Sequence, residues 1–247
     1  MQEEWQRRIE AARRLGRPGD IMLLAGEAPS PALRAEALRL VEAPVAAVEP
    51  RQVILFAGHM IDRPDRATPR FPPDRVPAAA AAIDAVLARL DAASDDLALC
   101  SGANGGDLLF GEACVRRGLS LELRLPQEES KFLDDSVTFA GDQWRDRFYT
   151  VKAHPRTKTY VMPDELGPGP PGTNVYARVN LWQLYTAMAW GDEKLRFICL
   201  WDGKPGDGPG GTQHMVEVAG ARTRHVYQID PATGKWEMVD GKRRLGD

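Results

Sequence analysis

Short, continuous apolar runs recur along the chain from residue 53 onward and predict the strands of a sheet. They are VILFAG (53–58), LALCSG (97–102), LSLELRLP (119–126), LRFICLWDG (195–203) and HVYQID (225–230). Apolar runs of this length without polar alternation are typical of parallel strands that are covered on both faces. We therefore expect five buried strands that pair mainly in parallel.

Segments with apolar residues at spacings of three and four separate these runs and predict helices. They cover residues 77–90, 107–117, 174–190 and 212–221. Strands that alternate with helices indicate an α/β fold with a doubly wound, mainly parallel, Rossmann-like sheet. The final segment PATGKWEMVD (231–240) predicts a turn and a returning strand, so we expect a C-terminal edge hairpin.

The first 50 residues have a different pattern, rich in Ala, Arg, Glu and Leu and without strand-like runs. Candidate helices cover 3–15 and 31–41, and Ser30 and Pro31 suit the N-cap and the first helical position of the second. We predict a helical arm over residues 1–50 and a Rossmann-like nucleotide-binding domain over residues 51–247. The arm is either the remnant of a helical repeat or an oligomer contact, and the pattern leaves both open.

Composition and charge argue against several classes of binding partner. The chain has 247 residues and a net charge of -3, which provides no strong positive field for a nucleic acid. No 18 apolar residues run together, so we expect no membrane partner. The three cysteines form no CxxC pair and predict buried, reduced thiols and a cytoplasmic location. The four histidines lack metal-ligand spacing, and we expect neither a metal nor a cofactor.

The segment SGANGGD (101–107) gives the strongest signal for a binding site, because it links a strand to a helix through a glycine-rich turn. Ligands of open parallel sheets bind at the carboxyl ends of the strands. Glycines allow the backbone to approach an anion, and the first turn of a helix offers unpaired N–H groups and a favourable dipole. We therefore expect Ser101, Gly102, Gly105 and Gly106 to contact a phosphate.

The segment GPGGT (208–212) follows another strand and opens another helix, so Gly210, Gly211 and Thr212 are candidates for the same role. Two such loops predict an anionic ligand held between two helix N-termini. Gly58 and His59 end the first strand, where His59 is placed to bond a ribose or a base. Arg70 precedes the stiff segment Phe71-Pro72-Pro73 and is a candidate for binding a phosphate. Asp202 ends another strand and is a candidate for binding a ribose hydroxyl.

Two carboxylates are candidates for bond-breaking chemistry. Asp107 lies at the start of the helix after the first glycine-rich loop, where a carboxylate also stabilises the helix dipole. Glu217 lies five residues after Thr212 and points either to the crevice or to solvent. Either carboxylate would stabilise an oxocarbenium-like centre or activate a water molecule.

The pattern of SGANGGD and PGGTQHMVE (209–217) resembles the SLOG superfamily of Rossmann-like nucleotide-binding domains. That group includes the Lonely-guy phosphoribohydrolases, the DNA-processing protein A domain and the N-terminal domains of TRPM-type channels. The resemblance covers about residues 53–230, and similar blocks occur in bacterial proteins that carry the domain beside helical repeats. It implies nucleotide binding, and relatives of this family often form homodimers.

The Lonely-guy enzymes cleave the N-glycosidic bond of nucleoside monophosphates and use a PGGxGTxxE motif with a catalytic Glu. Here Pro209, Gly210, Gly211 and Glu217 match that spacing, while Gln213 and His214 replace the Gly-Thr pair. The first hypothesis is therefore a module that binds a nucleotide or a nucleotide-derived signal. The alternatives are an N-glycosidase acting on nucleoside phosphates, and a protein-interaction domain that has lost the ligand.

Overall fold

The computed structural model describes residues 2–42, 49–206, 208 and 210–241, and this part of the chain contains one seven-stranded sheet. The strands lie in the order β4-β3-β2-β1-β5-β6-β7. Their bounds are β1 (Val53–Gly58), β2 (Leu97–Cys100), β3 (Ser120–Leu125), β4 (Thr157–Val161), β5 (Leu195–Leu200), β6 (Val226–Ile229) and β7 (Trp236–Val239). All neighbouring pairs are parallel except β6 and β7. The Rossmann-like fold and the edge hairpin are thus confirmed.

The strand β1 lies where the order of the sheet reverses. From β1 the chain builds outward through β2, β3 and β4, and it then returns to place β5 on the other side of β1. Val53 of β1, for example, pairs with Leu97 of β2 and with Leu195 of β5. The carboxyl edge beside β1 is the topological switch point, where open parallel sheets bind ligands.

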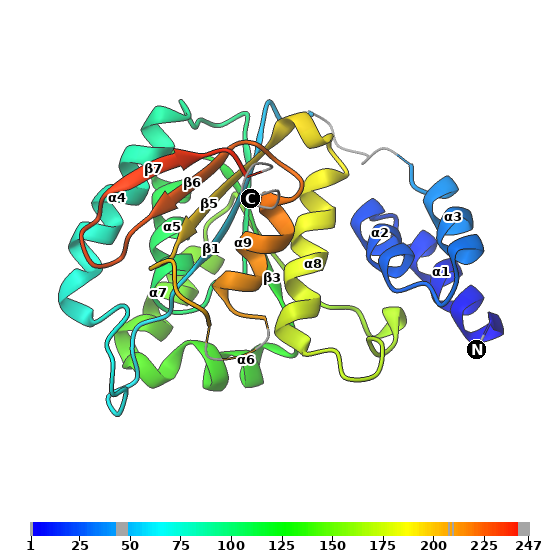
Figure 1. Cartoon of the computed structure of the whole chain (residues 1–247), viewed down its shortest axis with the longest axis horizontal. Helices are drawn as coiled ribbons and strands as arrows, with labels where there is room; N and C mark the ends of the chain where they lie inside the picture. The colour runs from blue at the N-terminus through cyan, green and yellow to red at the C-terminus, as the bar shows by residue number, and fades with distance from the viewer. Residues whose placement is uncertain (1, 43–48, 207, 209, 242–247) are drawn as a thin grey trace.

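Helices cover both faces of the sheet (Figure 1). One hydrophobic core joins alternate strand residues to α4 (Val76–Arg89), α5 (Gly106–Arg116), α6 (Glu129–Ser136) and α7 (Asp142–Lys152). The opposite strand residues pack against α8 (Val175–Met188) and α9 (Thr212–Gly220). Short 3-10 helices cover Pro73–Arg75, Thr138–Ala140, Asp164–Leu166 and Asp192–Lys194. The predicted helices are therefore present, and β4, α6 and α7 are elements that the sequence pattern did not reveal.

The N-terminal arm consists of α1 (Gln2–Leu15), α2 (Pro18–Gly26) and α3 (Pro31–Arg39), and it lies against the outer face of α8 (Figure 1). The oxygen of Ser30 accepts a hydrogen bond from the amide of Leu33, as expected of an N-cap. A separate hydrophobic core joins Trp5 and Leu23 of the arm to Trp182 of α8. The arm therefore covers α8, whose other side faces the sheet. The division at residue 50 stays a prediction, and residues 43–48 beside it lie outside the described part.

A buried ion-pair cluster fastens the arm to α8. Glu27, which follows α2, accepts hydrogen bonds from Arg8 at 2.9 Å and from Arg178 of α8 at 2.6 and 3.0 Å. The side chain of Glu27 is 7% exposed. Nearby, the indole N–H of Trp182 donates to the buried carboxylate of Asp20 at 2.6 Å. These contacts fix one orientation of the arm, because each charge would otherwise be buried without its partner.

Replacing Glu27 with alanine is expected to lower the free energy of unfolding by about 3–5 kcal/mol, because Arg8 and Arg178 lose their shared buried acceptor. Chemical denaturation measures this change. The matched control is Glu10→Ala on the same arm, because the carboxylate of Glu10 is 54% exposed and its pair with Arg13 is a surface pair. An equal effect of the two substitutions would show that the cluster does not fasten the arm.

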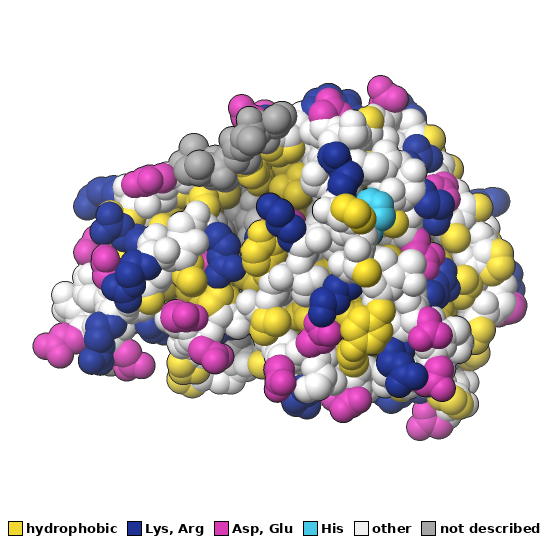
Figure 2. Space-filling view, turned by 180° about the vertical axis from the view of Figure 1, so that it is seen from behind, with side chains coloured by type: hydrophobic (Ala, Val, Ile, Leu, Met, Phe, Trp, Pro, Cys, Tyr) yellow, Lys and Arg dark blue, Asp and Glu magenta, His cyan; other side chains and the backbone are white. Residues whose placement is uncertain are grey.

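Cys100, Cys114 and Cys199 are buried in β2, α5 and β5, as predicted. Figure 2 shows Lys and Arg side chains interspersed with Asp and Glu over one face of the molecule. Among the residues that the structure describes, none of the helices has the length and apolar character needed to cross a bilayer.

Candidate functional site

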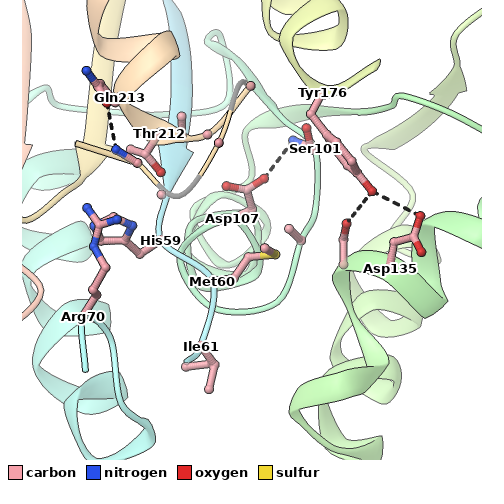
Figure 3. Close-up of a pocket in the computed structure, with 18 of the residues that line it drawn as sticks. His59, Met60, Ile61, Arg70, Ser101, Asp107, Asp135, Tyr176, Thr212 and Gln213 are labelled. Carbon is pink, nitrogen blue, oxygen red and sulfur yellow. Dashed lines mark hydrogen bonds between the residues drawn. The ribbon is translucent and has the colours of Figure 1, made fainter. Parts of the chain in front are cut away.

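A cavity of about 660 Å³ lies at the carboxyl ends of β1 and β2, near the switch point of the sheet. Both glycine-rich loops reach it: Ser101, Ala103 and Asp107 belong to the first, and Gly208, Gly210, Gly211 and Thr212 to the second. Segments that are about 100 residues apart in the sequence thus line one cavity (Figure 3). Its volume falls in the range of roughly 300–1,000 Å³ that is common for small-molecule sites.

The first loop is filled by a side chain of its own helix. One carboxylate oxygen of Asp107 accepts hydrogen bonds from the amides of Ser101 and Gly102, at 3.1 and 3.2 Å. The loop therefore does form an anion-binding turn, as the sequence suggested, but the chain's own carboxylate occupies it. A bound phosphate does not have these two amides available while Asp107 holds them.

Gly105 and Gly106 serve the packing of α5 against the end of β1. Gly105 has a φ of +79°, and a Cβ there would lie 2.7 Å from the carbonyl oxygen of His59. A Cβ on Gly106 would lie 3.0 Å from the Cα of Gly58. The amide of Gly106 donates to the carbonyl of His59 at 3.0 Å. These glycines allow two backbone segments to touch, and that contact places Asp107 beside β1.

Asp107 is a cavity residue whose pKa is strongly raised by burial. Burial raises its pKa from 3.8 to about 7, while hydrogen bonds from the backbone of Ala103, Ser101, Gly102 and Gly58 act in the opposite direction. The side chain lines the cavity although the residue is only 7% exposed. A carboxyl group that titrates near neutral pH can donate or accept a proton under ordinary conditions.

The second loop packs tightly against the start of α8. Gly210 has a φ of +86°, and a Cβ there would lie 2.4 Å from the amide nitrogen of Ala177. The side-chain amide of Asn180 donates to the carbonyl of Gly210 at 2.9 Å. The loop is therefore held in one place by α8 immediately before α9 begins at Thr212.

The first turn of α9 is open to a ligand. Gly211 is the N-cap residue, and no side chain of the described residues caps the helix. The first N–H groups of a helix have no acceptor within the helix, and the dipole there favours an anion. Gly211 and Thr212 both line the cavity. Of the two predicted loops, this is the one whose helix start has no side-chain cap among the described residues.

Arg70, Asp202 and His59 meet on one side of the cavity (Figure 3 labels Arg70 and His59). Arg70 donates to both carboxylate oxygens of Asp202, at 2.9 and 2.6 Å. Burial raises the pKa of Asp202, but the hydrogen bonds from Arg70, Lys204 and His59 outweigh this and hold it well below its usual value. Burial and Arg70 lower the pKa of His59 against the opposing effect of Asp202. The site therefore presents a fixed guanidinium and a neutral imidazole near pH 7.

The opposite side of the cavity is formed by α6, which the sequence pattern did not reveal, and by the start of α8, whose helix was predicted. Asp135 and Ser136 come from α6, and Tyr176 comes from the first turn of α8. The hydroxyl of Tyr176 donates to Asp135 at 3.3 Å. Gln183, deeper on α8, donates to the hydroxyl of Ser101 at 2.7 Å. No motif marked these residues, since each lies in a segment without a glycine-rich turn.

The structure brings most of the predicted residues together. Those that line the cavity are Gly58, His59, Arg70, Ser101, Asp107, Gly210, Gly211 and Thr212. Gly102, Gly105, Gly106 and Asp202 do not line it, but they hold residues that do, through the contacts given above. Pro209 of the second motif lies outside the described residues. In the described segments, no three His, Cys, Asp or Glu side chains gather as a metal site.

Glu217 is not brought to the cavity. Its side chain is exposed and accepts a hydrogen bond from Gln213 at 2.8 Å. Five residues along a helix correspond to a rotation of about 140° beyond one full turn, so a side chain at this spacing faces away from Thr212. The match to the Lonely-guy motif in the sequence therefore does not place a carboxylate at the site.

Comparison with known proteins finds similarity in overall structure. No family model matches the chain, and no curated protein matches it. The crystal structure of DNA processing protein A from Streptococcus pneumoniae matches with 14% sequence identity and a TM-score of 0.45. The match covers 99% of this chain and 87% of that chain.

Proposed function

We propose that this protein binds a nucleotide or a nucleotide-derived signalling ligand in the cavity at the switch point, with a phosphate at the start of α9. The observation that carries the proposal is the uncapped first turn of α9, where Gly211 and Thr212 line the cavity. Backbone N–H groups at a helix start bind phosphates without a charged side chain. The cavity volume suits a ligand of nucleotide size.

The charged side of the cavity supports an anionic ligand. The guanidinium of Arg70 lines the cavity, and its bidentate pair with Asp202 holds it in one orientation. The ionised Asp202 offsets the charge of Arg70, so the pair contributes an oriented guanidinium more than a net positive charge, and this group loses little side-chain entropy when the ligand arrives. Asp202 thus acts in the proposal by holding Arg70, and His59 is the group left to contact the sugar.

Hydrolysis of the N-glycosidic bond is the second candidate, and the position of Asp107 favours it. This carboxyl group lies in the cavity between the two sides (Figure 3), and its pKa is about 7. In its protonated form it would donate a proton to the leaving base. Water then adds to C1′ of the sugar and releases a proton to solvent, which restores the protonation of Asp107, and the products are the free base and the ribose phosphate. Glu217 has no part in this version of the reaction.

The test compares nucleoside monophosphates with the corresponding nucleosides by thermal shift and calorimetric titration. A ligand held only by the folded state raises the melting temperature. We expect the monophosphates to raise it and to bind at least about tenfold more tightly than the nucleosides, because a hydrogen-bonded charge contributes roughly 1.5–3 kcal/mol. Equal binding of both would contradict a phosphate site at α9.

Chromatography of the same mixtures separates the two candidates. Released base that disappears in an Asp107→Asn variant would establish the hydrolase, and binding without release would establish the binding module. Mass spectrometry of small molecules that co-purify with the protein identifies the ligand. If no phosphate-bearing compound binds, the cavity is not a nucleotide site, and the protein-interaction hypothesis is favoured instead.

A further inference from the structure

Asp135 occupies an unusual position at the far side of the cavity. Its Oδ2 atom accepts hydrogen bonds from Gln127 at 2.7 Å, from Lys131 at 2.9 Å and from Tyr176 at 3.3 Å. Its Oδ1 atom accepts none from the residues that the structure describes. Hydrogen bonds from Lys131, Gln127 and Tyr176 hold the pKa of Asp135 below its usual value. Asp135 lines the cavity as an ionised carboxylate, which can accept a hydrogen bond but cannot donate one.

The two sides of the cavity present different groups, which can contact different parts of one nucleotide. Figure 3 shows Thr212 and Gln213 on one side and Asp135 and Tyr176 on the other, with Asp107 and Met60 between them. A phosphate at Thr212 therefore places the sugar near Asp107 and directs the base toward Asp135. On that side the guanidinium of Arg63 lies 4.0 Å from the ring centre of Phe139, and both residues line the cavity. Stacked planar groups of this kind suit a flat aromatic base.

We propose that Asp135 selects the base, by accepting a hydrogen bond from the exocyclic amine of an amino-bearing base such as adenine or cytosine. The proposal rests on the nucleotide binding inferred above. A base with a carbonyl oxygen in that place, such as hypoxanthine or uracil, brings two acceptors together. Because the phosphate at α9 fixes the ligand, the base cannot slide to present another donor. The carboxylate oxygen and the carbonyl oxygen then face each other without a proton between them, and such a mismatch discriminates between close analogues.

Adenosine and inosine monophosphate provide a matched pair of probes, because they differ in the group at position 6 of the base and in the proton on the adjacent nitrogen. We expect the wild-type protein to bind adenosine monophosphate roughly 10–100-fold more tightly, the range of a hydrogen bond to a charged group. Cytidine and uridine monophosphate are expected to differ in the same direction. Calorimetric titration at pH 7 measures all four dissociation constants.

The decisive variant is Asp135→Asn. The donors Gln127, Lys131 and Tyr176 keep an oxygen on their side of the side chain, so the new amide NH₂ takes the place of Oδ1. This NH₂ group can donate a hydrogen bond to a carbonyl oxygen of the base, but it meets another donor in an exocyclic amine. The preference for adenosine monophosphate is therefore expected to vanish or reverse. The control is Asp134→Asn, which removes the same charge from an exposed residue of the same helix and is expected to keep the preference.

The possible results are distinguishable. A preference that is present in the wild type and in Asp134→Asn but absent in Asp135→Asn supports the proposal. Equal binding of adenosine and inosine monophosphate by the wild type overturns it and leaves nucleotide binding intact. A preference for adenosine monophosphate that persists in Asp135→Asn also overturns the proposal, because another residue must then distinguish the two bases. If none of the four nucleotides binds, the proposed function fails, and this assignment fails with it.

Discussion

The free energy of unfolding of the wild-type protein, measured relative to an Asp107→Asn variant, is expected to fall by about 4 kcal/mol between pH 4 and pH 8. Burial of Asp107 raises its pKa from 3.8 to about 7 in the folded protein. Each pKa unit corresponds to about 1.4 kcal/mol. The folded state therefore binds the proton more tightly than the unfolded state does. This contribution to stability is fully present below pH 3.8 and is lost as the pH rises through 7.

The Asp107→Asn variant is a suitable reference because its amide does not titrate. Its side-chain oxygen can still accept hydrogen bonds from the amides of Ser101 and Gly102, so the loop keeps its shape. Other titrating groups affect both proteins equally and cancel in the difference. Urea denaturation at several pH values gives the two free energies. A difference that does not vary with pH would show that the carboxyl group is not held in a desolvated site.

Ligand binding is expected to fall by about 100-fold or more in a Gly210→Ala variant that remains folded. The added Cβ would lie 2.4 Å from the amide nitrogen of Ala177 and 2.7 Å from the Cβ of Tyr176. The positive φ of +86° adds backbone strain for any residue other than glycine. Either the loop or the start of α8 must move. A displacement of about 1 Å in a site that positions its ligand can cost on the order of 100-fold.

The matched control for this substitution is Gly208→Ala in the same loop. A Cβ at Gly208 meets no atom within 4 Å, so the loop keeps its position. Circular dichroism confirms that each variant is folded, and calorimetric titration with adenosine monophosphate compares their affinities. If Gly210→Ala binds as tightly as Gly208→Ala, the contact between the second loop and α8 does not determine the site.

The sheet was predictable from the sequence where its strands are buried on both faces. Central strands such as β1 and β5 are continuous apolar runs because helices cover them on either side. The strand β4 (Thr157–Val161) was missed for the opposite reason. It lies at the edge of the sheet, and its residues TKTYV are only partly buried or exposed. Hydrophobic pattern alone does not distinguish such a strand from a loop.

The sequence predicted that the glycine-rich loops belong to the site, but it did not predict which group each loop contacts. Pattern placed SGANGGD and GPGGT at the carboxyl edge of the sheet, and the structure confirms that both reach one cavity. The sequence did not reveal that the carboxylate of Asp107 turns back to the amides of Ser101 and Gly102. That hydrogen-bonded turn depends on the path of the loop, and spacing along the chain does not determine it.

The far side of the cavity was missed because its residues carry no motif. Asp135 belongs to α6, in a polar segment where apolar spacing gave no helix signal. Tyr176 belongs to the helix predicted over residues 174–190, but no motif marked it as a site residue. The opposite error concerned Glu217, which a motif match in the sequence favoured and which the structure places on an exposed face. A side chain reaches a site through the rotation of its helix, and that rotation is set by tertiary packing.

The central claim is that the first turn of α9 binds the phosphate of a nucleotide. It is tested most directly by titrating ¹⁵N-labelled protein with adenosine monophosphate and following the backbone amide resonances. The account predicts that the amides of Gly211, Thr212 and Gln213 shift most, and that adenosine without its phosphate leaves them nearly unchanged. Resonances of α9 that stay fixed while the nucleotide shifts amides elsewhere, or while it shifts none, would contradict the account.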